Sequence, residues 1–309
     1  MAETLISPGV LARENDASQI TSQPVQAGAA IVGPTVKGNV NIPTLVTTYS
    51  EYLANFGSTF TSGSDEYSFL TSISAYNYFQ NGGTSLLVTK VASGSFTSAT
   101  SSLIAASAST NNAFTLETLG EGTLMNSDGT YGTNGTLTNG TTDNVRWEIV
   151  NPDLANGVFS VLIRRGDDTN QNKVILETFT NVSLDPKSPN YVARVIGDQT
   201  QTVQGSGTDV YLQTTGNYPN GSRFVRVSSV DKKTPDYFDN NGVAKNAFTS
   251  SIPLAQTGAF GTATGNIVSG MGAAKYYSEI SNTDTQGLLG TNYTTALNLL
   301  ANKDDYRYN

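Results

Sequence analysis

The chain changes character at Val91, and this change limits how it can fold. Before Val91, short apolar runs alternate with segments of helical spacing. After it, no lysine or arginine occurs until Arg146, and serine, threonine, asparagine, glycine and alanine dominate. Alternating strands and helices predict an α/β unit, whereas neutral polar residues with turn signals predict a β-rich one. We therefore expect an α+β protein: a split α/β core with a large inserted all-β domain and an extended N-terminal arm.

Residues 23–92 are expected to form the first part of the α/β core. Two apolar runs, Ala27–Gly33 and Thr84–Val91, have the length and composition of buried strands. Thr44–Thr47 predicts a shorter strand between them. Aromatic residues at helical spacing then predict a short helix over residues 49–56.

A longer helix is predicted from Ser64 to Gln80. Ser64 would cap its first turn, and Asp65 and Glu66 would stabilise the positive end of the helix dipole. The glycines that follow Asn81 would end it. The side expected to pack on the core consists of Phe69, Leu70, Ile73, Tyr76, Phe79 and Gln80.

Residues 93–270 are expected to form the inserted β-rich domain, either as one unit or as two, 93–200 and 201–270. Apolar and polar residues alternate here between turn signals, which is typical of strands. The strands are expected at Phe114–Leu119, Val145–Ile149, Phe159–Arg164, Val174–Phe179, Asp209–Gln213 and Ser222–Val230. Low-complexity disorder is the alternative for residues 93–110.

Residues 271–309 are expected to return to the α/β core. Asn292 can cap a helix that carries Tyr293, Leu297 and Leu300 at helical spacing. The sequence stops where another strand would begin, so we expect this part of the core to be incomplete.

The composition removes several classes of enzyme. The chain of 309 residues has no cysteine and no histidine, which excludes disulfides, thiolate metal sites and every catalytic triad or zinc site built on histidine. It has no glycine-rich phosphate loop. A net charge of −8 argues against binding to nucleic acid, and no apolar stretch is long enough for insertion into a membrane. We expect no enzymatic activity, no cofactor and no metal site, although carboxylate pairs stay possible.

Several motifs match functional patterns, but turns explain them better. Arg165-Gly166-Asp167 matches an integrin-binding tripeptide, and between two predicted strands it is expected to be a hairpin turn. Glycosylation acceptor patterns begin at Asn134, Asn139 and Asn181, but no secretory signal supports them. Asp167-Asp168 could offer oxygens to calcium, yet it lacks the distal glutamate of a calcium loop, so we expect a solvated turn.

Residues 1–22 are expected to form the extended arm. Its candidate functional residues are Leu5, Ile6, Pro8, Gly9, Val10 and Leu11. The aliphatic members are too apolar for a solvated tail, and residues 15–23 resemble a polar tether. We expect residues 4–14 to pair as a strand with another subunit, with any ladder interrupted at the proline. A frayed terminus is the alternative.

Short motifs in order along the chain resemble those of contractile-tail sheath proteins of tailed bacteriophages, the T4-like tail sheath family. In the first third they are Ser7–Val10, Ala29–Pro34, Lys37-Gly38, Ile42–Thr47, Phe56-Gly57, Tyr78–Gly83 and Leu87–Val91. Later ones are Asn151–Asp168, Val182–Asp198 and Ala296–Tyr306. Each motif is weak alone, whereas their order and spacing are more specific. Family members continue beyond the equivalent of Asn309, so this chain resembles their N-terminal part.

The resemblance implies a structural virion protein, assembled in the host cytoplasm. Sheath subunits form a homo-oligomer of hexameric rings stacked helically around a tail tube, and their contraction drives the tube through the bacterial envelope. The implied partners are further sheath subunits, the tail tube protein, and baseplate and tail terminator proteins. Two alternatives stay open: a baseplate or capsid-decoration protein, and a β-rich glycan-binding or glycan-cleaving phage protein that uses carboxylate pairs.

Overall fold

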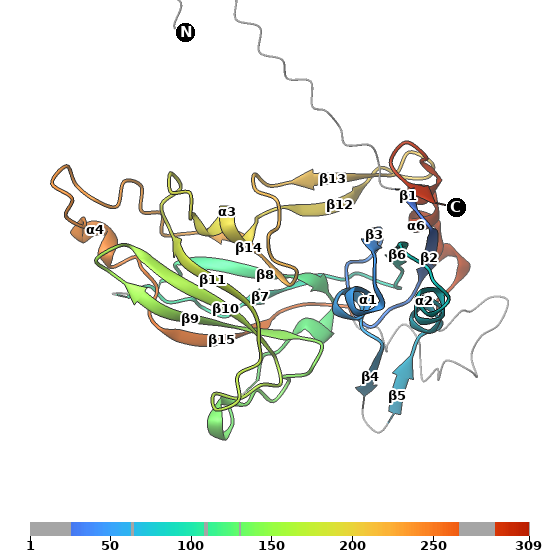
Figure 1. Cartoon of the computed structure of the whole chain (residues 1–309), viewed down its shortest axis with the longest axis horizontal. Helices are drawn as coiled ribbons and strands as arrows, with labels where there is room; N and C mark the ends of the chain where they lie inside the picture. The colour runs from blue at the N-terminus through green and yellow to red at the C-terminus, as the bar shows by residue number, and fades with distance from the viewer. Residues whose placement is uncertain (1–25, 63–64, 108–110, 130, 266–287, 309) are drawn as a thin grey trace, which may run out of the picture.

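The computed structural model describes residues 26–62, 65–107, 111–129, 131–265 and 288–308. Over these residues the protein is mostly β, with few helices. A curled seven-stranded sheet lies at one end of the molecule, and a three-stranded sheet with two helices beside it lies at the other (Figure 1). This arrangement is compatible with the expected α+β class. The domain boundaries proposed from the sequence stay predictions.

The three-stranded sheet is the centre of what we call the layered unit, formed by the described residues up to 90 together with 288–308. Its strands are β2 (Ala29–Gly33), β3 (Thr44–Val46) and β6 (Leu86–Lys90). β6 lies in the middle, parallel to β2 and antiparallel to β3. Every residue of β6 is buried, whereas β2 at the edge is half-buried until Gly33.

Helices cover both faces of this sheet. They are α1 (Tyr49–Phe56), α2 (Leu70–Gln80) and α6 (Thr294–Ala301). Leu86 and Val88 belong to the hydrophobic cluster under α1 and α2. Leu87 faces the other way and packs with Leu300 of α6. Successive residues of a strand point to opposite faces, and β6 can therefore hold the two helical layers together.

The curled sheet has the strand order β11-β10-β9-β15-β7-β8-β14, and all its pairs are antiparallel. Its strands are β7 (Ser98–Ser101), β8 (Phe114–Glu121), β9 (Val145–Asp153), β10 (Val158–Arg165), β11 (Ile175–Ser183), β14 (Val225–Val230) and β15 (Gln256–Gly261). Its apolar core includes Trp147, Phe114 and Phe159. The short helix α3 (Val192–Ile196) contacts both edge strands, β11 and β14. It thereby bridges the two edges of the curl.

Smaller elements complete the described chain. They are β1 (Gln26–Ala27), β4 (Thr59–Ser62), β5 (Asp65–Ser68), β12 (Thr200–Gln204), β13 (Tyr211–Thr215), β16 (Arg307–Tyr308), α4 (Asn246–Thr249), and the 3₁₀ turns η1 (Thr123–Met125), η2 (Thr133–Gly135) and η3 (Gly290–Tyr293). β1 and β16 pair in parallel, so the two ends of the described chain meet. β12 and β13 form a hairpin that extends towards α6 (Figure 1). There Asn298 Nδ2 donates to the Gly207 carbonyl at 2.6 Å.

Most strands expected from the sequence are confirmed. Those predicted to begin at Phe114, Val145, Phe159 and Val174 correspond to β8, β9, β10 and β11. In the stretch for which disorder was the alternative, residues 98–101 form β7. Alternation along a half-buried strand is a strong local signal, which explains this agreement.

The helix predicted from Ser64 begins later, so that prediction is wrong at its start. Asp65 and Glu66 lie in β5, which pairs antiparallel with β4, and α2 begins at Leu70. Ser64 itself lies outside the described residues. Acidic residues near a helix start contribute less than about 1 kcal/mol. The hairpin's backbone hydrogen bonds outweigh that preference.

The core-facing side of α2 is also different from the one predicted. Its buried residues are the small ones, Thr71, Ser72 and Ala75, while Ile73 and Tyr76 are exposed. A Cβ at Gly33 of β2 would lie 2.4 Å from Thr71 Oγ1, which shows how closely helix and sheet approach. Only small side chains fit at this close approach, so Ile73 and Tyr76 point outward, whereas Phe69 is buried and Phe79 packs against the core as expected.

The last helix begins one residue later than the predicted cap implies. Asn292 lies in η3, where its side chain accepts a hydrogen bond from the Leu289 N–H at 2.8 Å. α6 starts at Thr294 and buries Leu299 and Leu300. Leu297, expected on the apolar side, is 54% exposed.

Candidate functional site

The small sheet of the layered unit has two edge strands, β2 and β3. Among the described residues, no strand pairs with the free side of β2. The side chains from Ala29 to Val32 are half-buried, and both faces of the strand are apolar. An open apolar edge can accept a further strand through backbone hydrogen bonds. β2 is therefore a candidate assembly edge.

A row of exposed apolar side chains lies on α2 of the same unit. Leu70, Ile73 and Tyr76 are 41%, 37% and 45% exposed and follow one another at helical spacing. The Tyr76 ring lies edge-on to Tyr49, with the ring centroids 5.1 Å apart. Exposed apolar rows on a helix often mark protein–protein contacts. We call these three residues the α2 row.

The predicted arm residues cannot be placed on either feature. Leu5, Ile6, Pro8, Gly9, Val10 and Leu11 all lie outside the described residues. Their role in pairing between subunits stays a prediction.

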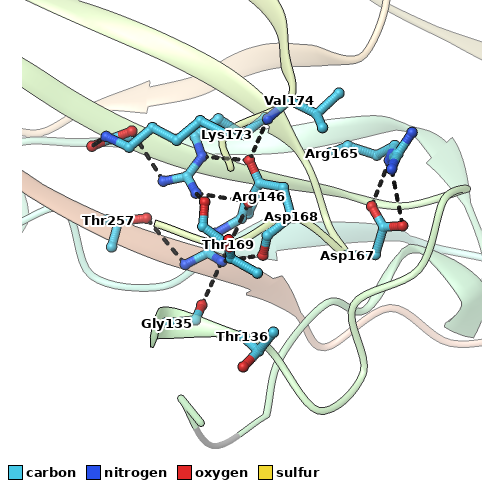
Figure 2. Close-up of polar contacts among 12 residues, drawn as sticks. Gly135, Thr136, Arg146, Arg165, Asp167, Asp168, Thr169, Lys173, Val174 and Thr257 are labelled. Atoms are coloured by element: carbon cyan, nitrogen blue, oxygen red, sulfur yellow. Dashed lines mark hydrogen bonds and ion pairs between the residues drawn. The ribbon is translucent and has the colours of Figure 1, made fainter. Parts of the chain in front are cut away.

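A buried ion cluster lies on the outer side of β9 and β10, under the turn that follows β10 (Figure 2). Arg164 donates to both carboxylate oxygens of Asp168 at 2.7 Å, and Arg146 lies 3.5 Å from the same group. Arg164 also pairs with Glu148 at 3.0 Å, and Lys173 with Glu148 at 2.7 Å. The Arg146, Arg164 and Asp168 side chains have no exposed surface.

The register of the sheet explains why the cluster forms. Arg146 and Arg164 are direct partners across β9 and β10, so two guanidinium groups lie side by side. Burial first, and then Arg164, lower the pKa of Arg146, while Asp168 acts in the opposite direction. The carboxylates are needed to balance these charges. The cluster therefore holds the strands and the turn together.

Asp168 corrects the expectation of a solvated turn. It is 3% exposed, and its carboxylate also accepts the Val174 N–H at 2.9 Å. The signal available in the sequence is an arginine beside apolar strand residues: Arg146 lies between Val145 and Trp147, and Arg164 follows the apolar run 161–163. Such residues are seldom buried without a partner, so they imply one nearby.

The integrin-like tripeptide is part of the same turn. β10 ends at Arg165 and pairs antiparallel with β11, as a hairpin requires. Arg165 and Asp167 bind each other through the guanidinium and the carboxylate (Figure 2). The expectation of a hairpin turn is confirmed.

A cleft of about 550 Å³ lies beside α3 and β14. Tyr191, Tyr218 and Asn217 line it, and Asp198 is the one carboxylate among its lining residues in the described chain. The Asp198 carboxylate already accepts the N–H groups of Asn217 and Tyr218, at 2.8 and 2.7 Å. A glycan-cleaving site needs two facing carboxylates. Among its described lining residues this cleft has a single carboxylate, Asp198, and the hydrogen bonds of that carboxylate support the loop.

Among the described residues, no group of three acidic side chains is placed to hold a metal ion. No helix in that part of the chain has the length and apolarity to span a bilayer.

The chain was also compared with known proteins. No family model matches the sequence, and no curated protein matches it. Among solved structures, it is similar to a sheath tail protein from Desulfitobacterium hafniense, with 11% identity and a TM-score of 0.26 over 72% of this chain and 39% of that one. It is also similar to a sheath tail protein from Listeria innocua, with 9% identity and a TM-score of 0.30 over 67% of this chain and 35% of that one. The matched region thus spans less than two fifths of either protein.

Proposed function

We propose that this chain is a structural subunit of a phage contractile tail sheath. Such subunits stack as hexameric rings around the tail tube and contract to drive the tube through the host envelope. The observation that carries the proposal is the open apolar edge of β2, which suits assembly through strands supplied by other subunits. The ordered sequence motifs support the sheath identity over other virion roles.

The proposed contact uses residues 4–14 as the strand supplied in trans. Burial of two or three of their aliphatic side chains would contribute about 3–8 kcal/mol before ordering costs. Repeated in every subunit, a contact of this size can hold a lattice. Contacts with the tail tube, baseplate and tail terminator proteins are part of the same proposal.

The test is polymerisation of the complete gene product. The double substitution Leu5→Asp and Ile6→Asp should abolish tubes seen by negative-stain electron microscopy, because charged side chains cannot be buried on a partner sheet. The matched control, Asn15→Asp with Ser18→Asp, adds the same charge to the tether and should leave tubes intact. The melting temperature of the 309-residue chain should stay the same in both variants.

Two results would contradict the proposal. Normal tubes from the Leu5→Asp, Ile6→Asp protein would exclude the arm as the connecting strand. Unmodified protein that forms only isolated rings or decorates capsids would favour a baseplate or capsid-decoration role.

A further inference from the structure

Two stretches of chain, 91–97 and 262–287, connect the layered unit and the curled sheet, and the described parts of the two, 91–97 and 262–265, lie side by side. Residues 91–97 lead from β6 to β7, and residues 262–265 follow β15. The Thr97 N–H donates to the Thr264 carbonyl at 3.1 Å, and the Thr264 N–H donates to Thr97 Oγ1 at 2.8 Å. Two parts connected through adjacent linkers can turn about them as about a hinge.

Phe96 fills the space between these linkers. A Cβ on Gly122 would lie 3.0 Å from its ring, and a Cβ on Gly265 would lie 2.5 Å from it. Both glycines have positive φ, 106° and 97°. The ring is thus held by backbone alone on these sides, and the contact is lost if the linkers separate.

Lys90, the last residue of β6, places its ammonium against this ring. The residue is 1% exposed, and Nζ lies 5.2 Å from the centre of the Phe96 ring. Nζ donates to the Gly38 carbonyl at 3.2 Å, and no carboxylate of the described residues lies within 4.0 Å of it. An ammonium carries three donors, so this buried charge is poorly satisfied.

Glu121, at the end of β8, is the acidic group whose charge acts on the pKa of Lys90. Its Oε2 accepts the Val40 N–H at 2.9 Å and so connects the loop before β3 to the curled sheet. Of the other charged groups around the joint, Lys37 is paired with Asp143 at 3.5 Å and Arg226 with Glu117, while Arg223 lines the pocket between Gly38 and Val145. Glu121 therefore compensates Lys90 only in part, and from a distance.

We propose that Lys90 makes this joint a two-state hinge: its ammonium is sealed in the closed arrangement seen here, gains water when the curled sheet turns away, and so favours opening. Glu121 has the opposite role, because it offsets part of the buried charge and holds the loop. These contacts define the joint whether or not the chain builds a sheath.

If Lys90 controls the hinge, the equilibrium between the closed and open states must depend on pH in one direction. Burial lowers its pKa from 10.5 to about 8, against the opposing effect of Glu121. The closed state thus binds fewer protons than an open state with a solvated lysine between these two values. Raising the pH through this window favours the closed state.

The decisive experiment is hydrogen exchange of the Val40, Thr97 and Thr264 amides at pH 7 in the 309-residue chain. Lys90→Met should slow their exchange at least tenfold, because the closed joint then buries no charge. Glu121→Gln should speed exchange of the Thr97 and Thr264 amides at least tenfold in the wild-type background and have no such effect on these two amides in the Lys90→Met background; the Val40 amide is left out of this comparison because Glu121 accepts its N–H directly. Lys173→Met, which removes a lysine paired with Glu148 away from the joint, should leave these amides unchanged.

Faster or unchanged exchange in Lys90→Met would overturn the proposal, since a lysine that clamps the joint predicts faster exchange. If that variant fails to fold, the pH dependence of proteolysis of the wild-type protein tests the proposal instead. Chymotrypsin cleavage after Phe96, normalised to a free peptide, should slow by up to about 30-fold from pH 7 to pH 9.5. The same slowing should persist in Glu121→Gln, which removes the other titrating group. A rate that stays level or rises with pH would also overturn the proposal.

Discussion

At the scale of single residues, the protein buries several charged side chains although its sequence contains few of them. Charged residues make up 14% of the sequence, yet Lys90, Arg146, Arg164 and Asp168 are all buried. Three of them meet in the cluster of Figure 2, where Asp168 together with Glu148 offsets the charges of the two arginines. A buried pair adds little net stability, but loss of one partner is costly because a bare charge is left behind.

Asp168→Asn should therefore lower the free energy of unfolding by about 3–5 kcal/mol. The amide keeps the shape but leaves Arg146 without its carboxylate partner and Arg164 with Glu148 alone. Urea unfolding followed by circular dichroism measures the change. The control is Asp167→Asn, which removes a partly exposed pair with Arg165 and should cost less than about 1 kcal/mol. Equal effects of the two substitutions would show that the cluster does not act as a buried network.

At the scale of elements, α2 shows how packing overrides an apolar pattern. Its spacing predicts a core-facing side that includes Ile73 and Tyr76, yet the helix approaches β2 through Thr71, Ser72 and Ala75. The absence of a side chain at Gly33 permits that approach. The α2 row is left exposed, which suits a contact with another chain.

Substitutions on the two sides of α2 should show which side packs against the core and which side reaches solvent. Ala75→Asp should destabilise the chain by more than about 3 kcal/mol, because it buries an unpaired carboxylate. Ile73→Lys should change stability by less than about 1 kcal/mol, because that side chain already reaches solvent. Thermal and urea unfolding of both variants measures this. A larger cost for Ile73→Lys would mean that the α2 row is covered within the chain.

At the scale of the whole molecule, the two parts meet at a joint whose stability depends on pH. The folded-state pKa of Lys90 is lowered to about 8 by burial. Below pH 8 the lysine is charged in both states, so the folded protein bears the full cost of burying it. Between pH 8 and 10.5 the unfolded state binds more protons, and stability should rise with pH.

The free energy of unfolding should thus increase across this window by at most about 3 kcal/mol. Tyrosines act in the opposite direction near its upper end; burial raises the pKa of Tyr306 to about 12, for example. The quantity to measure is therefore the difference in the free energy of unfolding between wild type and Lys90→Met, obtained by urea unfolding at pH 7.5, 9 and 10. That difference should shrink as the pH rises. A constant difference would show that Lys90 does not titrate with folding.

The sequence by itself determined most strands of the curled sheet, the helix over residues 49–56 and the central strand β6, because each is encoded by local periodicity and turn residues. It could not indicate that β4 and β5 pair with each other, since weak helix-start signals there compete with strand pairing. The inner side of α2 and the partners of Arg164 and Lys90 were decided only by tertiary structure. These features depend on contacts between residues far apart in the chain, such as Glu121 with Val40, and no local pattern records which distant groups meet.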